Sequence, residues 1–565
     1  MPTLAPTNFN IVVSVLGGWI SLFGLVSYLL KENFYLSEAL ISLLAGLFFS
    51  PHATNFVRPL EYAGSEENLN AITLYFTRLV LGVQLVLAGV QLPSRYLKKE
   101  WKPLALLLGP IMTAMWIITS LLVWGLVPNL PFLHALAIGA CVTPTDPVLS
   151  NVIVKGRFAD HNVPKDLQKI IIAESGANDG LGYPFLFLAL YLIKYIGDGG
   201  ASEQGGAGLA IGLWFGETWG YTILLSVIYG AVVGWIAKEL LHFCEEHKFV
   251  DRESFLVFAF SLALFITGTC GMIGSDDILA CFIAGNVFTW DDWFRLETLD
   301  EVHMLLNVTI FMWYGAVCPW HSFVDNSIIP IYRLIPLGIL ILLFRRMPLV
   351  LAFYKKIPQI DGLQQAIFMG FFGPIGCSAI FYLYVTLEFI DTLNPNNGSA
   401  PRWDVAHLKE GVSVLVWFMA ICSVVVHGLS IPLGKFGVYL PRTLSRTLTT
   451  PEDLSFQIGA RIIPRSRSRD GTATHTPTDS RSVSARPVYR VGGSIIREQT
   501  GTTTDAIEVG KLQDDLEVRP KSIELGSLPS APSPTLHNRT IRFPDESSSA
   551  RRGSQEPKGD AKTES

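Results

Sequence analysis

The chain has 565 residues; half of them are hydrophobic, only 16% carry a charge, and the mean hydropathy is +0.38. This composition excludes an ordinary water-soluble protein and indicates a polytopic membrane protein. The formal net charge of −5 says little about partners, because loops and the C-terminal tail carry nearly all of the charged residues.

Apolar windows recur along the first 433 residues and predict thirteen membrane-spanning segments. Ten windows reach the roughly 17–25 residues that a spanning helix needs. They lie at about 11–30, 70–92, 103–127, 132–154, 168–196, 218–242, 254–271, 301–320, 364–386 and 411–433. Three shorter windows, at about 36–51, 276–290 and 328–344, fit either short spans or re-entrant or interfacial segments.

The loop charges predict an orientation in the membrane. With thirteen spans, four loops rich in Lys and Arg fall on one side: 94–102, 155–169, 238–252 and 345–356. The segment 197–217 on the other side has no Lys or Arg. Because basic loops stay in the cytosol, we expect the N-terminus outside and the C-terminus inside.

Two of the spans contain residues that interrupt a helix. Pro144 and Pro147 flank Asp146 in the span at 132–154, and Pro374 stands between two glycines in the span at 364–386. Interrupted helices at corresponding places in the two halves of a transporter point to an ion site at mid-membrane. The pattern predicts two inverted repeats whose broken helices cross, although two unrelated proline kinks would give the same residues.

The span at 168–196 carries the polar side chains that suggest chemistry. Glu174 and Asn178 are four residues apart and share a helix face, and Asp179 is the next residue. A carboxylate inside a membrane is a default candidate for moving ions or protons. Asp179 is therefore predicted to bind either a proton or a small cation. Glu174 is expected to pair with Arg345 or Arg346, with the other arginine at the cytosolic interface.

Other candidate residues have weaker signals. Asp276 and Asp277 open a span at its expected outer end, where they would either attract cations or cap the helix. His427 is a lone intramembrane histidine, more often a hydrogen-bonded packing residue than a pH sensor. Asn397 is a candidate glycosylation site, and Ser554 follows two arginines as a candidate phosphorylation site.

The composition changes after about residue 445, where Ser, Thr, Arg and Pro dominate. Such a segment cannot bury enough apolar surface to fold. We therefore expect a membrane domain at 1–440, with core and dimerisation subdomains interleaved, and a disordered cytosolic regulatory tail at 451–565.

Five motifs in this order resemble those of the monovalent cation:proton antiporters, and specifically the fungal plasma-membrane sodium/proton antiporters. They are Thr143–Pro147, Ala173–Gly180, Arg346–Val350, Gly373–Gly376 and Val426–Gly428. The resemblance implies an all-α fold of thirteen or twelve helices in two inverted repeats, a homodimer, and exchange of Na⁺ or Li⁺, often K⁺, for H⁺.

The same resemblance implies roles for individual residues. Asp179 would hold the cation or the proton, with Asn178, Asp146 and Thr145 in support. Glu174 would pair with Arg346, whose spacing to Val350 follows the family pattern.

The predicted function is thus a secondary antiporter that extrudes Na⁺ or Li⁺ for salt tolerance and pH homeostasis. One carboxylate in the sixth span suggests one proton per cation, unless Asp146 also titrates. A cation channel or a non-transporting cation sensor on the same scaffold is the alternative. No enzyme activity, cofactor or nucleic-acid partner is expected, since the chain has no Gly-rich phosphate loop of the Lys-Ser/Thr type.

Overall fold

The computed structural model of the protein describes residues 6–33, 36–154, 162–196, 205–250, 254–291, 300–393 and 403–448, together with the short segments 489–491 and 494–496. The chain divides into two units, Met1–Phe456 and Gln457–Ser565. Every helix described lies in the first unit, which agrees with the predicted all-α membrane fold.

The first half of this unit contains the segments up to the long helix α14. They are α1 (Asn8–Asn33), α2 (Glu38–Phe49), α3 (Pro59–Ala63), α4 (Glu66–Gln91), α5 (Tyr96–Lys99), α6 (Trp101–Leu106), the π-helix η1 (Leu107–Ile111) and α7 (Met112–Leu126). Next come α8 (Phe132–Cys141), α9 (Pro147–Val154), α11 (Lys165–Gly180), α12 (Tyr183–Tyr195), α13 (Gly206–Leu213), the π-helix η3 (Trp214–Leu224) and α14 (Leu225–Glu246).

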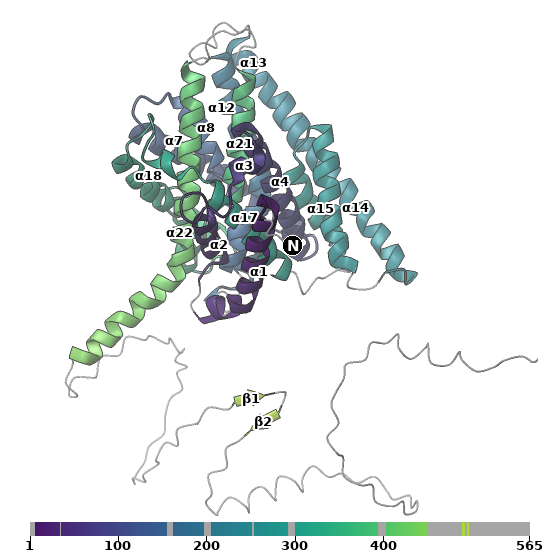
Figure 1. Ribbon diagram of the computed structural model, residues 1–565. Helices are drawn as coiled ribbons and strands as arrows, with labels where there is room; N and C mark the ends of the chain where they lie inside the picture. Colours follow the sequence, from purple (N-terminus) through teal and green to yellow (C-terminus); the bar gives the residue numbers. More distant parts are fainter. Residues whose placement is uncertain are drawn as a thin grey trace, which may run out of the picture. The chain divides into compact units, whose positions relative to one another are not determined.

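The second half begins with α15 (Ser254–Ile273), α16 (Asp277–Phe288), α17 (Asp300–Val317) and the 3₁₀ helix η4 (Trp320–Phe323). It continues with α18 (Ile331–Phe344), α19 (Met347–Phe353), the 3₁₀ helix η5 (Tyr354–Lys356), α20 (Leu363–Phe371), α21 (Cys377–Thr392) and α22 (Trp403–Leu448). Within the bundle, α4, α15 and α14 are neighbours (Figure 1).

Each apolar window predicted from the sequence contains helix. Among the residues that the structure describes, six helical segments are long and apolar enough to cross a membrane. They are Asn8–Val26, Glu66–Gln91, Trp101–Leu126, Gly206–Glu246, Ile331–Lys356 and Asp404–Ser430. Shorter apolar helices account for other windows, and the number of thirteen complete crossings stays a prediction.

Both predicted interruptions are present. The first separates α8 from α9 at residues 142–146, and the second separates α20 from α21 at residues 372–376. A third break, between α11 and α12, lies inside the window predicted at 168–196 and was not predicted from the sequence. Pro184 explains it, because proline has no N–H for the carbonyl of Gly180 and its ring would clash there.

Close helix packing in the bundle depends on small residues. A methyl group added to Gly46 of α2 would lie 2.0 Å from the Met312 carbonyl oxygen of α17. One added to Gly315 of α17 would lie 2.1 Å from the Leu43 carbonyl oxygen of α2. The two backbones therefore touch at this crossing, as in other membrane helices that meet through glycine.

The tail prediction concerns residues that lie mostly outside the described part of the chain. In the second unit the structure describes one antiparallel strand pair, β1 (Tyr489–Val491) and β2 (Ser494–Ile496), in which Tyr489 pairs with Ile496. The sequence analysis had predicted no strand there. The candidate modification sites Asn397 and Ser554 also lie outside the described residues.

Candidate functional site

The two predicted breaks lie against each other in the middle of the bundle. The backbone N–H of Asp146, in the first break, donates to the carbonyl of Pro374 in the second, at 3.0 Å. Prolines and glycines free backbone groups at both places, and within a membrane such groups must be satisfied by other parts of the protein. The contact joins segments more than 200 residues apart and makes the breaks one polar centre.

Arg345 links the same two breaks. Its Nη1 donates to the Val142 carbonyl at the end of α8, and its Nη2 donates to the Gly373 carbonyl just after α20. The carbonyl ends of helices carry partial negative charge, which a guanidinium neutralises. Arg345 is only 2% exposed, so it does not anchor at the interface as one of the two arginines was expected to do.

Arg346 faces the carboxylate that the sequence analysis assigned to it. Its Nη1 and Nη2 donate to the two oxygens of Glu174, the second at 2.8 Å, in a bidentate pair. Its Nε donates to the Met369 carbonyl of α20 at 3.0 Å. Both charged side chains are at most 3% exposed, so the pair ties α11 to the start of α19 inside the protein.

Asn178 holds the first break through two hydrogen bonds to one residue. Its amide oxygen accepts from the Thr145 backbone N–H at 3.2 Å, and its amide nitrogen donates to the Thr145 hydroxyl at 2.7 Å. The Ser175 hydroxyl lies 3.2 Å from the Thr145 hydroxyl and 3.0 Å from that of Ser150. These contacts fix the side of the break that faces α11.

The Asp179 carboxylate lies next to this network and takes no part in it. It is 1% exposed, and neither of its oxygens accepts a hydrogen bond from the described residues. Asp146 is fully buried beside it. Its Oδ2 accepts from the Leu149 N–H at 3.2 Å, and its carboxylate also lies within reach of the N–H groups of Cys377 and Ser378 at the start of α21. Its Oδ1 has no hydrogen bond of standard geometry from the described residues. The Ser378 hydroxyl faces Asp179 and is also without a standard hydrogen bond. Buried carboxylate oxygens without donors need a proton or a cation to neutralise them.

A model of the family described as "Sodium/hydrogen exchanger, transmembrane" matches residues 19–433, which include both breaks and all of α11. The chain belongs to this exchanger family. The resemblance inferred from the five motifs is thereby confirmed.

Fungal members of the exchanger family are among the similar sequences. The chain is 35% identical over 460 residues to Na⁺/H⁺ antiporter 2 of Zygosaccharomyces rouxii, with 79% of this chain and 55% of that protein covered. It is 36% identical over 463 residues to the Na⁺/H⁺ antiporter of Saccharomyces cerevisiae, covering 79% and 46%. A Schizosaccharomyces pombe Na⁺/H⁺ antiporter is 28% identical over 468 residues, covering 80% and 95%. The chain thus spans about half to three fifths of the length of the first curated relatives it matches.

A solved exchanger structure has the same fold. The sodium proton antiporter MjNhaP1 of Methanocaldococcus jannaschii superposes with a TM-score of 0.52 at 17% identity. The match covers 76% of this chain and 98% of MjNhaP1. At this identity the likeness supports the helical fold alone.

The acidic pair of this exchanger-family chain lies deeper than the sequence suggested, while the capping role that was one of its two predicted alternatives is confirmed for Asp276. Asp276 and Asp277 are 0% and 2% exposed, so they do not form an accessible acidic surface at a helix end. Asp276 caps α16 by accepting from the N–H groups of Ile278 and Leu279, at 3.0 and 3.1 Å. Asp277 accepts from Arg78 Nε at 2.8 Å. Arg78 is the thirteenth residue of the 26-residue α4, so the pair lies halfway along that helix.

His427 is part of the support for the second break in this exchanger fold. Its Nε2 lies 3.1 Å from the Phe371 carbonyl, where α20 ends, and its Nδ1 lies 3.0 Å from the Ser423 hydroxyl. That hydroxyl accepts from the Ile375 N–H at 2.7 Å. The histidine is 4% exposed, so these contacts give it a structural place on both sides of the break.

Two further residues at the exchanger site escaped the sequence analysis. The Tyr382 hydroxyl donates to the backbone carbonyl of Asp179, and its ring packs directly on Gly182. Arg78 pairs with Asp277 inside the bundle. Arg78 had a signal, since it is a charged residue inside an apolar window, whereas an aromatic residue in a span has none.

Few charged side chains are available at the site to bind a small cation. Within the described part of the chain, no three His, Cys, Asp or Glu side chains come together as a metal-binding group. Among the described residues of this centre, both carboxylate oxygens of Asp179, Oδ1 of Asp146 and the Ser378 hydroxyl have no hydrogen bond of standard geometry. Carboxylate, hydroxyl and carbonyl oxygens are the ligands that hard cations prefer.

Proposed function

We propose that this protein is a secondary antiporter that exchanges Na⁺ for H⁺ across a membrane by alternating access. The observation that carries the proposal is the Asp179 carboxylate, which is buried beside two crossing helix breaks and has no hydrogen bond of standard geometry from the described residues. Membership of the sodium/hydrogen exchanger family and the names of its relatives support the same activity.

The exchange follows from competition for one carboxylate. A proton and a sodium ion can each neutralise Asp179, and the described residues give this carboxylate no ion pair. Binding of one ligand therefore requires release of the other. If the occupied site opens to only one side at a time, the outward gradient of one ion drives the inward movement of the other.

Finer properties belong to the same proposal. We expect Li⁺ to replace Na⁺ and K⁺ to be a further substrate, with the protein a homodimer in the plasma membrane, its N-terminus outside and its C-terminus in the cytosol. The core subdomain would carry the site past the dimerisation subdomain. The protein would act as a transporter and not as an enzyme.

The decisive experiment measures ion-driven proton flux in vesicles that contain the purified full chain. A sodium gradient should move protons in the opposite direction, and Asp179→Asn should reduce this flux to that of protein-free vesicles, because an amide cannot exchange a proton for a cation. Testing Na⁺, Li⁺ and K⁺ separately gives the selectivity.

The matched control is Asp166→Asn, a change of the same type in the same helix at a side chain that is 76% exposed. It should leave exchange unchanged. Exchange that survives Asp179→Asn would refute the site assignment, and sodium flux without proton flux would indicate a channel instead.

A further inference from the structure

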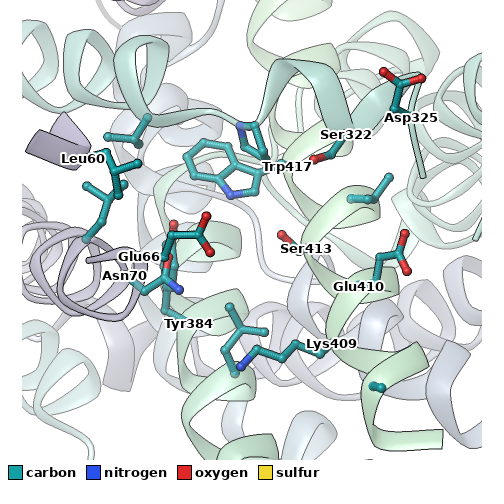
Figure 2. A pocket seen from close by; sticks show the side chains of 16 residues that line it. Leu60, Glu66, Asn70, Ser322, Asp325, Tyr384, Lys409, Glu410, Ser413 and Trp417 are labelled. Atoms are coloured by element: carbon teal, nitrogen blue, oxygen red, sulfur yellow. The ribbon is translucent and has the colours of Figure 1, made fainter. Parts of the chain in front are cut away.

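Two adjoining cavities open at one end of the bundle, where α4 and α22 begin and α21 ends. Their volumes are about 570 and 730 Å³, and both are lined by Glu66, Asn70, Tyr384 and Lys409. Figure 2 shows the smaller of the two. The larger cavity also reaches Glu388. Under the predicted orientation this is the outer end of the protein.

The cavities stop short of Asp179. Tyr384 of α21 lines both of them, whereas Tyr382, two residues earlier, already donates to the Asp179 carbonyl. The rings of Tyr382 and Tyr183 pack edge to face with their centres 5.5 Å apart. The passage between the cavities and the buried carboxylate is therefore closed by protein in this structure.

The Arg78–Asp277 ion pair lies in the same layer. Arg78 Nε is 2.8 Å from Asp277 Oδ2, and Arg78 is also within electrostatic reach of Glu388, which lines the larger cavity, and of Tyr183. The guanidinium lies on Gly271 of α15, where a methyl group would come within 2.1 Å of Nη2. A positive charge that is 28% exposed thus pairs with the buried Asp277 and also acts on Glu388 of the acidic cavity.

Asp276 continues the path beyond this pair. Its Oδ1 caps α16, but its Oδ2 has no hydrogen-bond partner and is fully buried. A methyl group on Gly180 would lie 2.9 Å from this oxygen, which places it beside the residue that follows Asp179. Asp276 is therefore a free acceptor between the Arg78–Asp277 pair and Asp179.

We propose that the Arg78–Asp277 ion pair is the gate between these cavities and the exchange site. While the pair is formed, the guanidinium repels cations that approach from the cavity and ties α4 to α16. When the pair separates, the free oxygen of Asp276 receives the cation on its way to or from Asp179. This inference rests on the proposed function for the identity of the ion, whereas the opening and closing of the passage can be measured without transport.

The native Cys377 offers a test that does not depend on transport. It begins α21, is fully buried, and lies within electrostatic reach of both Asp146 and Asp179. In a full-length chain that keeps Cys377 and replaces the other six cysteines, a membrane-impermeant thiol reagent reports access to the site from each side separately. Vesicles of the two orientations provide the two sides.

Arg78→Gln should raise the labelling rate from the cavity side about tenfold, which corresponds to a shift of about 1.4 kcal/mol in the gate equilibrium. Labelling from the opposite side should not rise. Arg78→Lys keeps the charge but loses the geometry of the guanidinium, so its rate should fall between those of Arg78→Gln and the parent. Asp277→Asn breaks the same pair and should behave like Arg78→Gln.

Arg58→Gln is the control, since Arg58 pairs with Glu61 at the surface, with both side chains well exposed. It should label as the parent does. An unchanged rate in folded Arg78→Gln and Asp277→Asn, or an equal rise from both sides, would overturn the gate. Sodium-driven proton flux, measured in parallel, tests the proposed function on its own: a parent without flux but with gated labelling would refute exchange and leave the gate standing.

Discussion

Glu174 and Arg346 are opposite charges that have no access to water. Each is at most 3% exposed, and together they make two parallel hydrogen bonds. Removing charges from water is costly, so such a pair adds little net stability, whereas breaking it leaves one buried charge uncompensated. The pair therefore constrains the position of α11 more than it strengthens the fold.

A double-mutant cycle tests this account of the pair. Glu174→Gln and Arg346→Gln should each lower the free energy of unfolding by about 3–5 kcal/mol, because each leaves a lone buried charge. The double variant should lose much less free energy of unfolding than the sum of the two single losses, because it leaves no buried charge without a partner. Thermal unfolding in detergent is measured for the purified parent, the two single variants and the double variant. Strictly additive losses would contradict the ion pair.

At the scale of elements, the glycine crossing of α2 and α17 shows how helices approach in this bundle. A Cβ atom at Gly315 would overlap the backbone of α2 at Leu43 and Leu47, with the nearest atom at 2.1 Å. Backbone atoms cannot give way as a flexible side chain can. Any larger residue must therefore push the two helices apart.

Gly315→Ala should accordingly destabilise the protein by about 1–3 kcal/mol, the usual cost of overpacking. Gly24→Ala in α1 is the matched control, since nothing lies within 4 Å of the added methyl group. There alanine should stabilise the helix by up to about 1 kcal/mol through its better helix propensity. Melting temperatures of the two variants should move in opposite directions, and equal shifts would contradict the crossing.

The elements also show what the sequence could and could not predict. Prolines allowed the breaks beside Asp146 and Gly373 to be predicted, because proline lacks the backbone N–H of a helical hydrogen bond in any tertiary structure. The depth of Asp276 was misplaced, since an apolar window fixes a span but not how far its start lies inside the bundle. The apolar pattern alone left Arg345 and Arg346 as equal partners for Glu174, whereas the spacing of Arg346 to Val350 in the family motif selected Arg346, which is the residue that pairs with Glu174 in the structure.

At the scale of the whole molecule, the membrane unit and the C-terminal unit are separate. The family model ends at residue 433, and the contact boundary falls after Phe456. All residues of the candidate site lie before both limits. The candidate site thus belongs wholly to the first unit.

A chain that ends after Phe456 should keep sodium-driven proton flux within about twofold of the full chain, because its site and bundle are complete. The assay is the vesicle measurement described above, with equal amounts of reconstituted protein. The shortened chain carrying Asp179→Asn serves as the inactive reference. Loss of flux from a shortened chain that remains folded and monodisperse would show that the second unit takes part in transport.

Arg345 has a mechanical consequence for the whole molecule. One planar side chain holds a carbonyl from each broken helix, at Val142 and Gly373. If the two helices moved apart, the buried guanidinium of Arg345 would lose these hydrogen-bond acceptors, at a cost of several kcal/mol. Arg345 thus holds the two broken helices together at their crossing. In the proposed exchange cycle, we expect the motion that exposes the ion to leave this contact intact and to take place around it.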